Sequence, residues 1–251
     1  MPQSSSVSRV FAVIPSRWGS SRFPGKPLHV IGGKPLVQHV WERCGACENL
    51  AGMLVATDDE RIFEAVTGFG GRVVMTSAEH ETGTDRIAEA VRALPEATHI
   101  VNVQGDEPLI DPRLIDELAA VITADGGPDM ATAANPLAVD DPAVADPNVV
   151  KVVMALDGRA LYFSRSPLPF FRNPVAGLPV YRHKGIYAYT RSFLERFVTW
   201  PQSPLEQAES LEQLRALENG ASIRVLPTED KSPGVDTPEQ AMAIEELIQF
   251  H

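Results

Sequence analysis

The sequence predicts an α/β protein with a mostly parallel central sheet and a smaller mixed β region in its second half. Two observations favour this fold class. Short β-branched apolar segments alternate with helical segments through the first half, the pattern of strands joined by crossover helices. Beyond Pro128, longer β-like segments are separated by Pro-rich loops. We therefore expect one elaborated domain at positions 10–251, preceded by a flexible, Ser-rich tail at positions 1–9.

The first half is predicted to contain four buried parallel strands and four helices. The apolar runs that predict the strands lie at positions 10–14, 53–56, 73–75 and 100–103. The helical segments lie at positions 35–47, 59–67, 85–94 and 111–123. Because such crossovers cover both faces of a parallel sheet, ligands are expected at the carboxyl ends of its strands.

The second half is predicted to add β segments and one helix with well-marked ends. The β segments lie at positions 149–154, 160–164, 181–189 and 223–227. The helix is predicted at positions 204–218, because Ser203 suits the N-cap and Pro204 the first helical position, and Asn219-Gly220 ends it. Glu206 would complete a capping box, so capping is its first interpretation.

The charge balance and the apolar pattern limit the classes of partner. A formal net charge of −11 argues against a broad nucleic-acid or anionic-membrane surface. No stretch approaches the roughly 18 apolar residues of a membrane span, and the first apolar run is cut too early for a secretory segment. We expect a cytoplasmic protein with no nucleic-acid partner and no membrane insertion. Cys44 and Cys47 would suit a redox or zinc motif, but without a second pair we favour two small residues one helical turn apart.

A cationic loop rich in glycine and serine follows the first predicted strand. Arg17, Arg22 and Lys26 lie around its glycines. Backbone N–H groups of such a loop can bind an anion, and the cations add charge-assisted donors. The loop matches neither the dinucleotide fingerprint nor the Walker pattern. We interpret it as a triphosphate-binding loop, and the alternative is an exposed turn with solvated charges.

Two Gly-Asp turns supply candidate metal ligands. Asp106 should project from the carboxyl end of a central strand, where a carboxylate facing a triphosphate needs a cation such as Mg²⁺. An ordinary turn aspartate is the alternative, and the neighbouring Glu107 is expected to face solvent. Asp236 lies in the second turn, where it could equally cap the final helix near Pro238.

Basic and hydrogen-bonding residues in the second half suit recognition of a hydroxylated anion. Arg165 ends one β segment, and His183 and Tyr187 lie on another. A single histidine on a strand is more often structural, so His183 stays open between the two interpretations.

Taken together, these segments closely resemble the 3-deoxy-manno-octulosonate cytidylyltransferase family. The resemblance runs from Val13 to about Glu246. Its most specific segments are positions 22–28, 55–58, 83–86, 102–108, 161–165, 182–189, 211–215 and 234–239. It implies a Rossmann-like nucleotidyltransferase fold, a homodimer and Mg²⁺ as cofactor. The implied reaction transfers CMP from CTP to 3-deoxy-D-manno-octulosonate (Kdo) with release of pyrophosphate, the sugar-activation step of lipopolysaccharide synthesis.

The resemblance also implies roles for individual residues. CTP would be handled by Arg17, Lys26 and Arg86, and Mg²⁺ would be held by Asp106 and Asp236. The residues expected to act in catalysis are Arg17, Lys26, Asp106 and Asp236. The residues expected around the sugar acid are Gln104, Arg165, His183, Tyr187, Glu212 and Gln213. Positions 10–130 and 225–251 would form the nucleotide-binding core, and positions 131–224 the sugar-binding and dimerisation region.

Three other classes of protein share part of these features. A CMP-sialic acid synthetase would share the loop and the aspartates, but Arg165, His183 and Glu212 favour Kdo. A dinucleotide-dependent oxidoreductase should show the glycine fingerprint and an acidic residue about 20 positions on. A non-catalytic binding subunit would be expected to lack a carboxylate or Lys26. The sequence leaves open the exact sugar acid, the number of Mg²⁺ ions and the identity of any general base.

Overall fold

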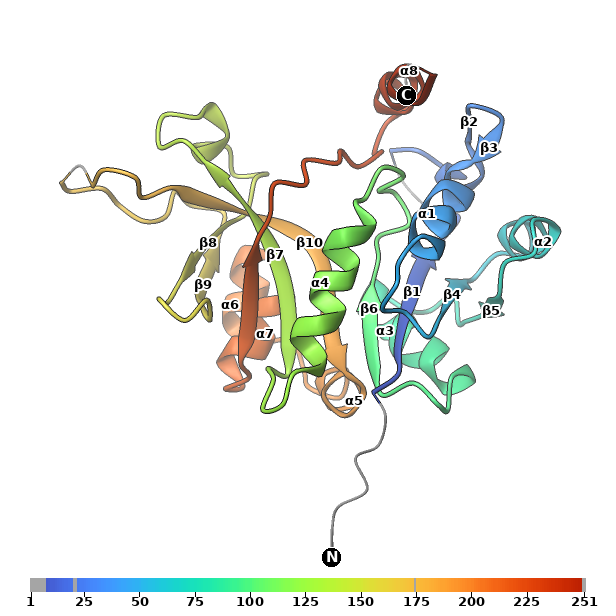
Figure 1. Cartoon of the computed structure of the whole chain (residues 1–251), viewed down its shortest axis with the longest axis horizontal. Helices are drawn as coiled ribbons and strands as arrows, with labels where there is room; N and C mark the ends of the chain where they lie inside the picture. The colour runs from blue at the N-terminus through green and yellow to red at the C-terminus, as the bar shows by residue number, and fades with distance from the viewer. Residues whose placement is uncertain (1–7, 20–21, 174, 250–251) are drawn as a thin grey trace, which may run out of the picture.

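The computed structural model describes residues 8–19, 22–173 and 175–249, so most of the predicted tail at positions 1–9 lies outside the described residues. Within these residues, one nine-stranded sheet forms the centre of the molecule (Figure 1). The order along its main path is β11 (Ile223–Pro227), β7 (Met130–Leu137), β10 (Val180–Thr190), β6 (His99–Asn102), β1 (Val10–Ser16), β4 (Gly52–Thr57) and β5 (Val73–Met75).

The main path of the sheet is parallel except at β10. Strands β6, β1, β4 and β5 pair in parallel, as do β7 and β11. Strand β10 is antiparallel to both of its neighbours, β6 and β7. Two further strands, β8 (Lys151–Met154) and β9 (Ala160–Ser164), extend the sheet from β10 by antiparallel pairing. The predicted fold class, a mostly parallel sheet with a mixed second half, is confirmed.

Helices cover both faces of the sheet. One face carries α1 (Leu36–Gly45), α2 (Glu60–Gly68) and α4 (Pro112–Thr123). The other carries α3 (Gly83–Ala90), α5 (Arg191–Phe197) and α7 (Gln213–Glu218). Alternate residues of β1 separate the two cores, because Ala12 and Ile14 pack in the first and Phe11 and Val13 in the second. A strand buried on both faces reads as a continuous apolar run, which is why the sequence predicts it.

Short elements complete the chain at the turns. The 3-10 helices are η1 (Lys26–Leu28), η2 (Val91–Ala93) and η3 (Pro142–Val144), and β2 (Val30–Ile31) pairs with β3 (Lys34–Pro35). The last helix, α8 (Pro238–Gln249), lies beside β2 beyond the carboxyl ends of β1 and β6 (Figure 1). A small separate core joins them, formed by Ile31, Leu36, Val235, Ala241 and Ile244. This packing fixes the segment that carries Asp236.

The prediction of a single helix at positions 204–218 is wrong. The chain forms α6 (Pro204–Glu209) and then α7, separated at Ser210, whose φ of 50° is left-handed. The predicted cap at the start is present, since the backbone N–H of Ser203 donates to Glu206 Oε2 at 3.1 Å. Local composition favours continuation here, but tertiary contacts of Glu209, described below, fix the break.

Two elements carry little sequence signal. Strand β7 is rich in alanine and poor in the β-branched residues that mark strands. Helix α5 begins immediately after β10, with Thr190 as its N-cap and no intervening turn. None of the helices in the described part of the chain has the length and apolar content to cross a bilayer.

Candidate active site

A cavity of about 300 Å³ opens at the carboxyl ends of β1 and β6. The chain passes from β1 outward to β4 and β5 and then returns to the other side of β1 as β6, and ligands of open α/β sheets bind at such a reversal. The lining residues come from the loop after β1, from η1, from the turn before α3, from the turn after β6 and from the segment before α8. They are Pro15, Ser16, Arg17, Arg22, Lys26, Pro27, His80, Glu81, Thr82, Gly83, Arg86, Gln104, Gly105, Asp106 and Asp236.

The loop after β1 folds back on Trp18, and this sets the direction of Lys26. Gly25 has a φ of +72°, and a Cβ there would lie 2.8 Å from the Trp18 ring. The N–H of Gly25 donates to the carbonyl of Trp18 at 3.1 Å. Arg61 also packs over the Trp18 ring, with its guanidinium carbon 3.3 Å from the ring centroid. Only glycine combines this backbone conformation with so close an approach.

Lys26 is the point on which the two predicted metal ligands converge. Its Nζ lies 2.7 Å from Asp106 Oδ2 and 3.2 Å from Asp236 Oδ1. Arg22 Nη2 lies 3.3 Å from the other carboxylate oxygen of Asp236. The two turns are also joined through the backbone, because the N–H of Val235 donates to the carbonyl of Asp106 at 2.8 Å. Asp236 therefore turns its carboxylate toward the cations of the loop.

Gly105 allows the turn after β6 to lie directly against the end of β1. A Cβ at this position would lie 2.7 Å from the carbonyl oxygen of Pro15 and 2.9 Å from Ser16 Oγ. The Pro15 backbone cannot move aside as a flexible side chain can. The position of the neighbouring Asp106 therefore depends on the absence of a side chain at Gly105.

Arg86 lines the cavity but is fixed from behind. Its side chain is 3% exposed, and Nη2 lies 2.7 Å from Asp58 Oδ2. Nη1 donates to Thr76 Oγ1 and to the carbonyl of Ser77. The guanidinium is thus a held cation at the base of the cavity and not a mobile surface group.

Among the residues predicted around the sugar acid, only Gln104 lines the cavity. Gln104 Nε2 donates to the carbonyl of Gly185 at 2.9 Å, which connects the turn after β6 to β10. His183 and Tyr187 lie on either side of Gly185, with ring centroids 5.3 Å apart. Burial lowers the pKa of His183 to about 3, so its imidazole is neutral, and Nε2 shares a hydrogen bond with Thr132 Oγ1 at 3.0 Å.

Glu212 and Gln213 lie at the start of α7, facing α3. Thr84 Oγ1 donates to Glu212 Oε2 at 2.6 Å, and Arg215 Nη2 donates to Oε1 at 3.1 Å. Burial raises the pKa of the Glu212 carboxyl and also that of the Tyr187 hydroxyl. Gln213 Nε2 is buried without a hydrogen-bond partner among the described residues. These polar groups are buried or partly buried, and the Glu212 side chain keeps 28% of its surface exposed.

The guanidinium of Arg165 donates hydrogen bonds to backbone carbonyls of this chain. Nε donates to the carbonyl of Glu209 at 2.6 Å, and Nη1 donates to that of Pro147 at 3.0 Å. The Glu209 carboxylate accepts from Ser164 Oγ and from the Arg165 N–H. These contacts join the end of β9 to the break between α6 and α7, which explains why the chain leaves the helical path at Ser210.

The expectation that Glu107 faces solvent is wrong. Its side chain is 12% exposed, and Oε2 lies 2.9 Å from Lys184 Nζ on β10. Burial is the main cause of the raised pKa of the Glu107 carboxyl. The sequence does not indicate that Glu107 pairs with Lys184, because the two residues lie on segments far apart in the chain.

Three described carboxylate side chains line the cavity, those of Glu81, Asp106 and Asp236, and of these Asp106 and Asp236 share contacts with Lys26 and could hold a divalent cation together. Residues 8–19, 22–173 and 175–249 contain no group of three or more His, Cys, Asp and Glu side chains placed to hold a metal ion. The oxygens of both aspartates already converge on one cationic group, the Lys26 ammonium. A hard cation that takes one or two carboxylates and completes its shell with phosphate oxygens and water fits this donor set.

A cationic loop opposite two carboxylates, at the carboxyl edge of this sheet, is the arrangement expected of a nucleotidyltransferase, and comparison with known proteins identifies that class. The family model described as Cytidylyltransferase matches residues 11–223. The chain is 50% identical to the 3-deoxy-manno-octulosonate cytidylyltransferase of Solibacter usitatus, over 96% of this chain and 95% of the relative. It therefore belongs to the cytidylyltransferase family, and the resemblance predicted from the sequence is confirmed.

Two further relatives bear on the substrate. The chain is 51% identical to the 8-amino-3,8-dideoxy-manno-octulosonate cytidylyltransferase of Shewanella halifaxensis, over 92% of this chain and 94% of the relative. The solved structure of a CMP:2-keto-3-deoxy-manno-octonic acid synthetase complexed with CTP has a TM-score of 0.92 and 43% identity, and the match covers 97% of this chain and 99% of that one. These relatives share the nucleotide and differ in the sugar acid.

Proposed function

We propose that this enzyme transfers CMP from CTP to Kdo and releases pyrophosphate. The observation that carries the proposal is the convergence of Lys26, Asp106 and Asp236 at the carboxyl edge of the sheet. The CTP complex of the 43% identical structure and the Kdo-named relative at 50% identity support the choice of substrates.

CTP would lie in the cavity with its phosphates against the loop after β1. Lys26 and Arg17 would neutralise phosphate charge, and Arg86 would add a fixed cation at the base. The anomeric hydroxyl of Kdo would then attack the α-phosphorus in line, with pyrophosphate leaving from the opposite side. Positioning and charge neutralisation would supply most of the rate enhancement.

Mg²⁺ is the cofactor that we propose for the reaction, held by Asp106 and Asp236. When bound, it would neutralise phosphate charge and lower the pKa of a coordinated hydroxyl. Its binding would release Lys26 from the two carboxylates for contact with the phosphates. The present distances support this proposal, because one ammonium lies 2.7 Å from Asp106 Oδ2 and 3.2 Å from Asp236 Oδ1.

The sugar acid would lie on the β10 side of the cavity. His183 is neutral and could exchange a hydrogen bond with a sugar hydroxyl, and the unpartnered Nε2 of Gln213 could donate one. Gln104, Tyr187 and Glu212 would complete the polar surroundings. Arg165 would contribute positive charge toward the sugar carboxylate while holding the turn at Ser210.

The test is pyrophosphate release with matched substrate panels. CTP is combined with Kdo, 8-amino-3,8-dideoxy-manno-octulosonate, sialic acid and a neutral sugar, and Kdo is combined with CTP, UTP and ATP. We expect the highest kcat/KM with CTP and Kdo. A higher value with the 8-amino sugar would transfer the proposal to that substrate, and turnover of sialic acid alone would overturn it.

We also propose that the enzyme acts as a homodimer in the cytoplasm. Leu161 and Phe170 are large apolar side chains that lie 54% and 89% exposed in the second half of the chain, where a partner would cover them. Light scattering after gel filtration should give twice the mass of one chain. Replacement of Phe170 by Asp should shift that mass toward the monomer, and cell fractionation tests the location.

A further inference from the structure

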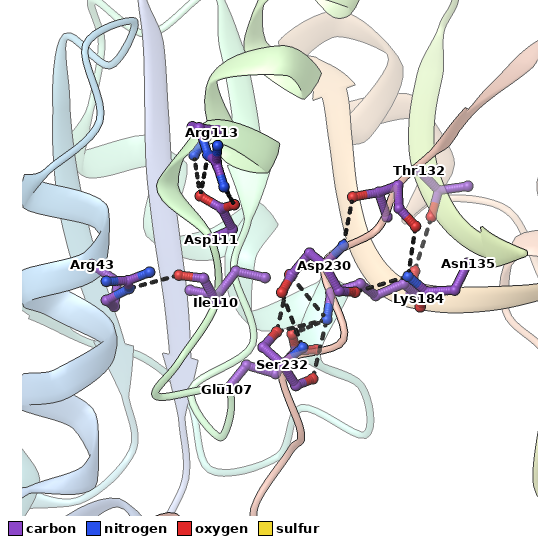
Figure 2. Close-up of polar contacts among 11 residues, drawn as sticks. Arg43, Glu107, Ile110, Asp111, Arg113, Thr132, Asn135, Lys184, Asp230 and Ser232 are labelled. Atoms are coloured by element: carbon purple, nitrogen blue, oxygen red, sulfur yellow. Dashed lines mark hydrogen bonds and ion pairs between the residues drawn. The ribbon is translucent and has the colours of Figure 1, made fainter. Parts of the chain in front are cut away.

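Lys184 lies at the centre of a group of polar contacts that joins three separate segments (Figure 2). Its Nζ lies 2.9 Å from Glu107 Oε2 and 3.3 Å from Asp230 Oδ2. The same ammonium donates to Ser232 Oγ at 2.8 Å. The side chains of Lys184, Glu107 and Asp230 are 7%, 12% and 8% exposed, so little solvent competes for these contacts.

Each partner of Lys184 lies close in sequence to one of the two aspartates of the cavity. Glu107 directly follows Asp106, and Ser232 precedes Asp236 by four positions. Asp230 and Ser232 form one compact turn, because the N–H of Ser232 donates to Asp230 Oδ1 and its hydroxyl donates to Oδ2, both at 3.0 Å. One ammonium therefore holds both aspartate-bearing segments.

The backbone around Lys184 is itself fixed. The pairing of β10 with β7 shifts register between Lys184 and Tyr187. Thr132 Oγ1 contacts the carbonyls of Lys184 at 3.1 Å and Ile186 at 2.7 Å, within this bulge. Gln104 Nε2 donates to the carbonyl of Gly185 between them. The bulge fixes the position and direction of the Lys184 side chain, as bulges next to active sites commonly do.

We propose that Lys184 is a positioning residue that holds both segments on the β10 bulge and so, together with the hydrogen bond from the Val235 N–H to the Asp106 carbonyl, sets the separation of Asp106 and Asp236. The inference rests on the proposed function, in which the two aspartates share one metal ion. Lys26 does not provide this separation, because its contacts with the aspartates would change when CTP and Mg²⁺ bind. Lys184 lies outside the cavity lining, so its contacts can persist through the reaction.

The experiment measures binding of Mn²⁺, as a paramagnetic substitute for Mg²⁺, in the presence of CTP and without a sugar acid, so that no transfer occurs. Electron paramagnetic resonance counts the free Mn²⁺ at each addition. We expect Lys184→Met to weaken Mn²⁺ affinity by about 10- to 100-fold, the range for residues that support metal ligands. Ser232→Ala removes one of the contacts and should shift affinity in the same direction by less.

Lys231→Met is the matched control. Lys231 lies in the same turn, is exposed and has no part in the contacts of Lys184, so its Mn²⁺ affinity should equal that of the unaltered protein. Hydrogen exchange of the metal-free protein adds a structural readout. Lys184→Met should raise exchange at positions 104–110 and 228–236 together, since one ammonium holds both.

The outcomes separate this inference from the proposed function. Unchanged Mn²⁺ affinity in folded Lys184→Met would overturn the positioning role. If that variant does not fold, Ser232→Ala decides, and unchanged affinity there overturns the role. If the unaltered protein fails to make CMP-Kdo, the proposed function fails, while the exchange measurement still tests whether Lys184 holds both segments.

Discussion

Replacing Lys26 by Met removes the ammonium on which the cavity is centred. Methionine keeps most of the length and apolar stem of lysine, so the change is chiefly one of charge. The side chains of Lys26, Asp106 and Asp236 are 14%, 31% and 44% exposed, which places the charge in a partly dry site. Loss of one preorganised charge there should lower kcat/KM by about 2 to 4 kcal/mol, roughly 30- to 900-fold.

The same change should have a smaller effect on stability. Two carboxylates lose their shared cation, but both retain solvent contact, so the cost lies between those of an exposed and a buried ion pair. We expect the free energy of unfolding of the metal-free protein to fall by about 1 to 2 kcal/mol. Added Mg²⁺ should restore more stability to Lys26→Met than to the unaltered protein, because the vacated space between the carboxylates accepts a cation.

The assays are pyrophosphate release for kcat/KM and urea denaturation with and without Mg²⁺. Lys34→Met is the matched control, because Lys34 is 45% exposed and pairs with Glu42 at 2.7 Å outside the cavity. It should leave kcat/KM unchanged and alter stability by less than about 0.5 kcal/mol. An unaltered kcat/KM in folded Lys26→Met would refute the predicted role of Lys26, since it would show that the reaction does not need the ammonium.

Three further predictions concern the aspartates, His183 and Gly105. Asp106→Asn and Asp236→Asn should each reduce kcat/KM severely, with the double variant little worse than the poorer single one, because ligands of one ion act as a unit. Additive losses in this cycle would indicate independent roles. The pKa of His183 is lowered from 6.5 to about 3, so the unfolded chain binds the extra proton between these values and stability falls as the pH drops from 6.5 toward 3. His183→Gln should flatten this fall, by up to about 1.4 kcal/mol per pH unit, and equal slopes in urea melts would contradict it. Gly105→Ala should reduce kcat/KM because its Cβ would lie 2.7 Å from the Pro15 carbonyl, whereas Gly68→Ala, with open space at Cβ, should not.

Residues that act through local sequence could be predicted without the structure. The alternation of apolar segments predicts the strands of the first half, because burial on both faces removes polar positions from them. Lys26 and Asp106 each come after the carboxyl end of a predicted parallel strand. Because those ends meet at one edge of the sheet, the two residues could be placed at the same edge. The capping role of Glu206 depends only on a spacing of three residues and is confirmed.

Residues that act through tertiary contacts could not be predicted in this way. The pairing of Glu107 with Lys184 requires the register of β10 beside β6, which no local pattern contains. The break at Ser210 runs against the helical composition around it and depends on contacts from Arg165 to the carbonyl of Glu209. The roles assigned to the sugar-binding residues stay predictions, since among them only Gln104 lines the cavity.

The contacts of Lys26 have a consequence for how the chain reaches its native state. They close loops of 80 residues to Asp106 and 210 residues to Asp236. Closure of such long loops is entropically unfavourable until the sheet and the small core beneath α8 are in place. A partly folded chain can hold native-like helices while its cation and carboxylates are still apart. During refolding, catalytic competence should therefore return later than helical circular dichroism, and the lag between them reports the docking of α8.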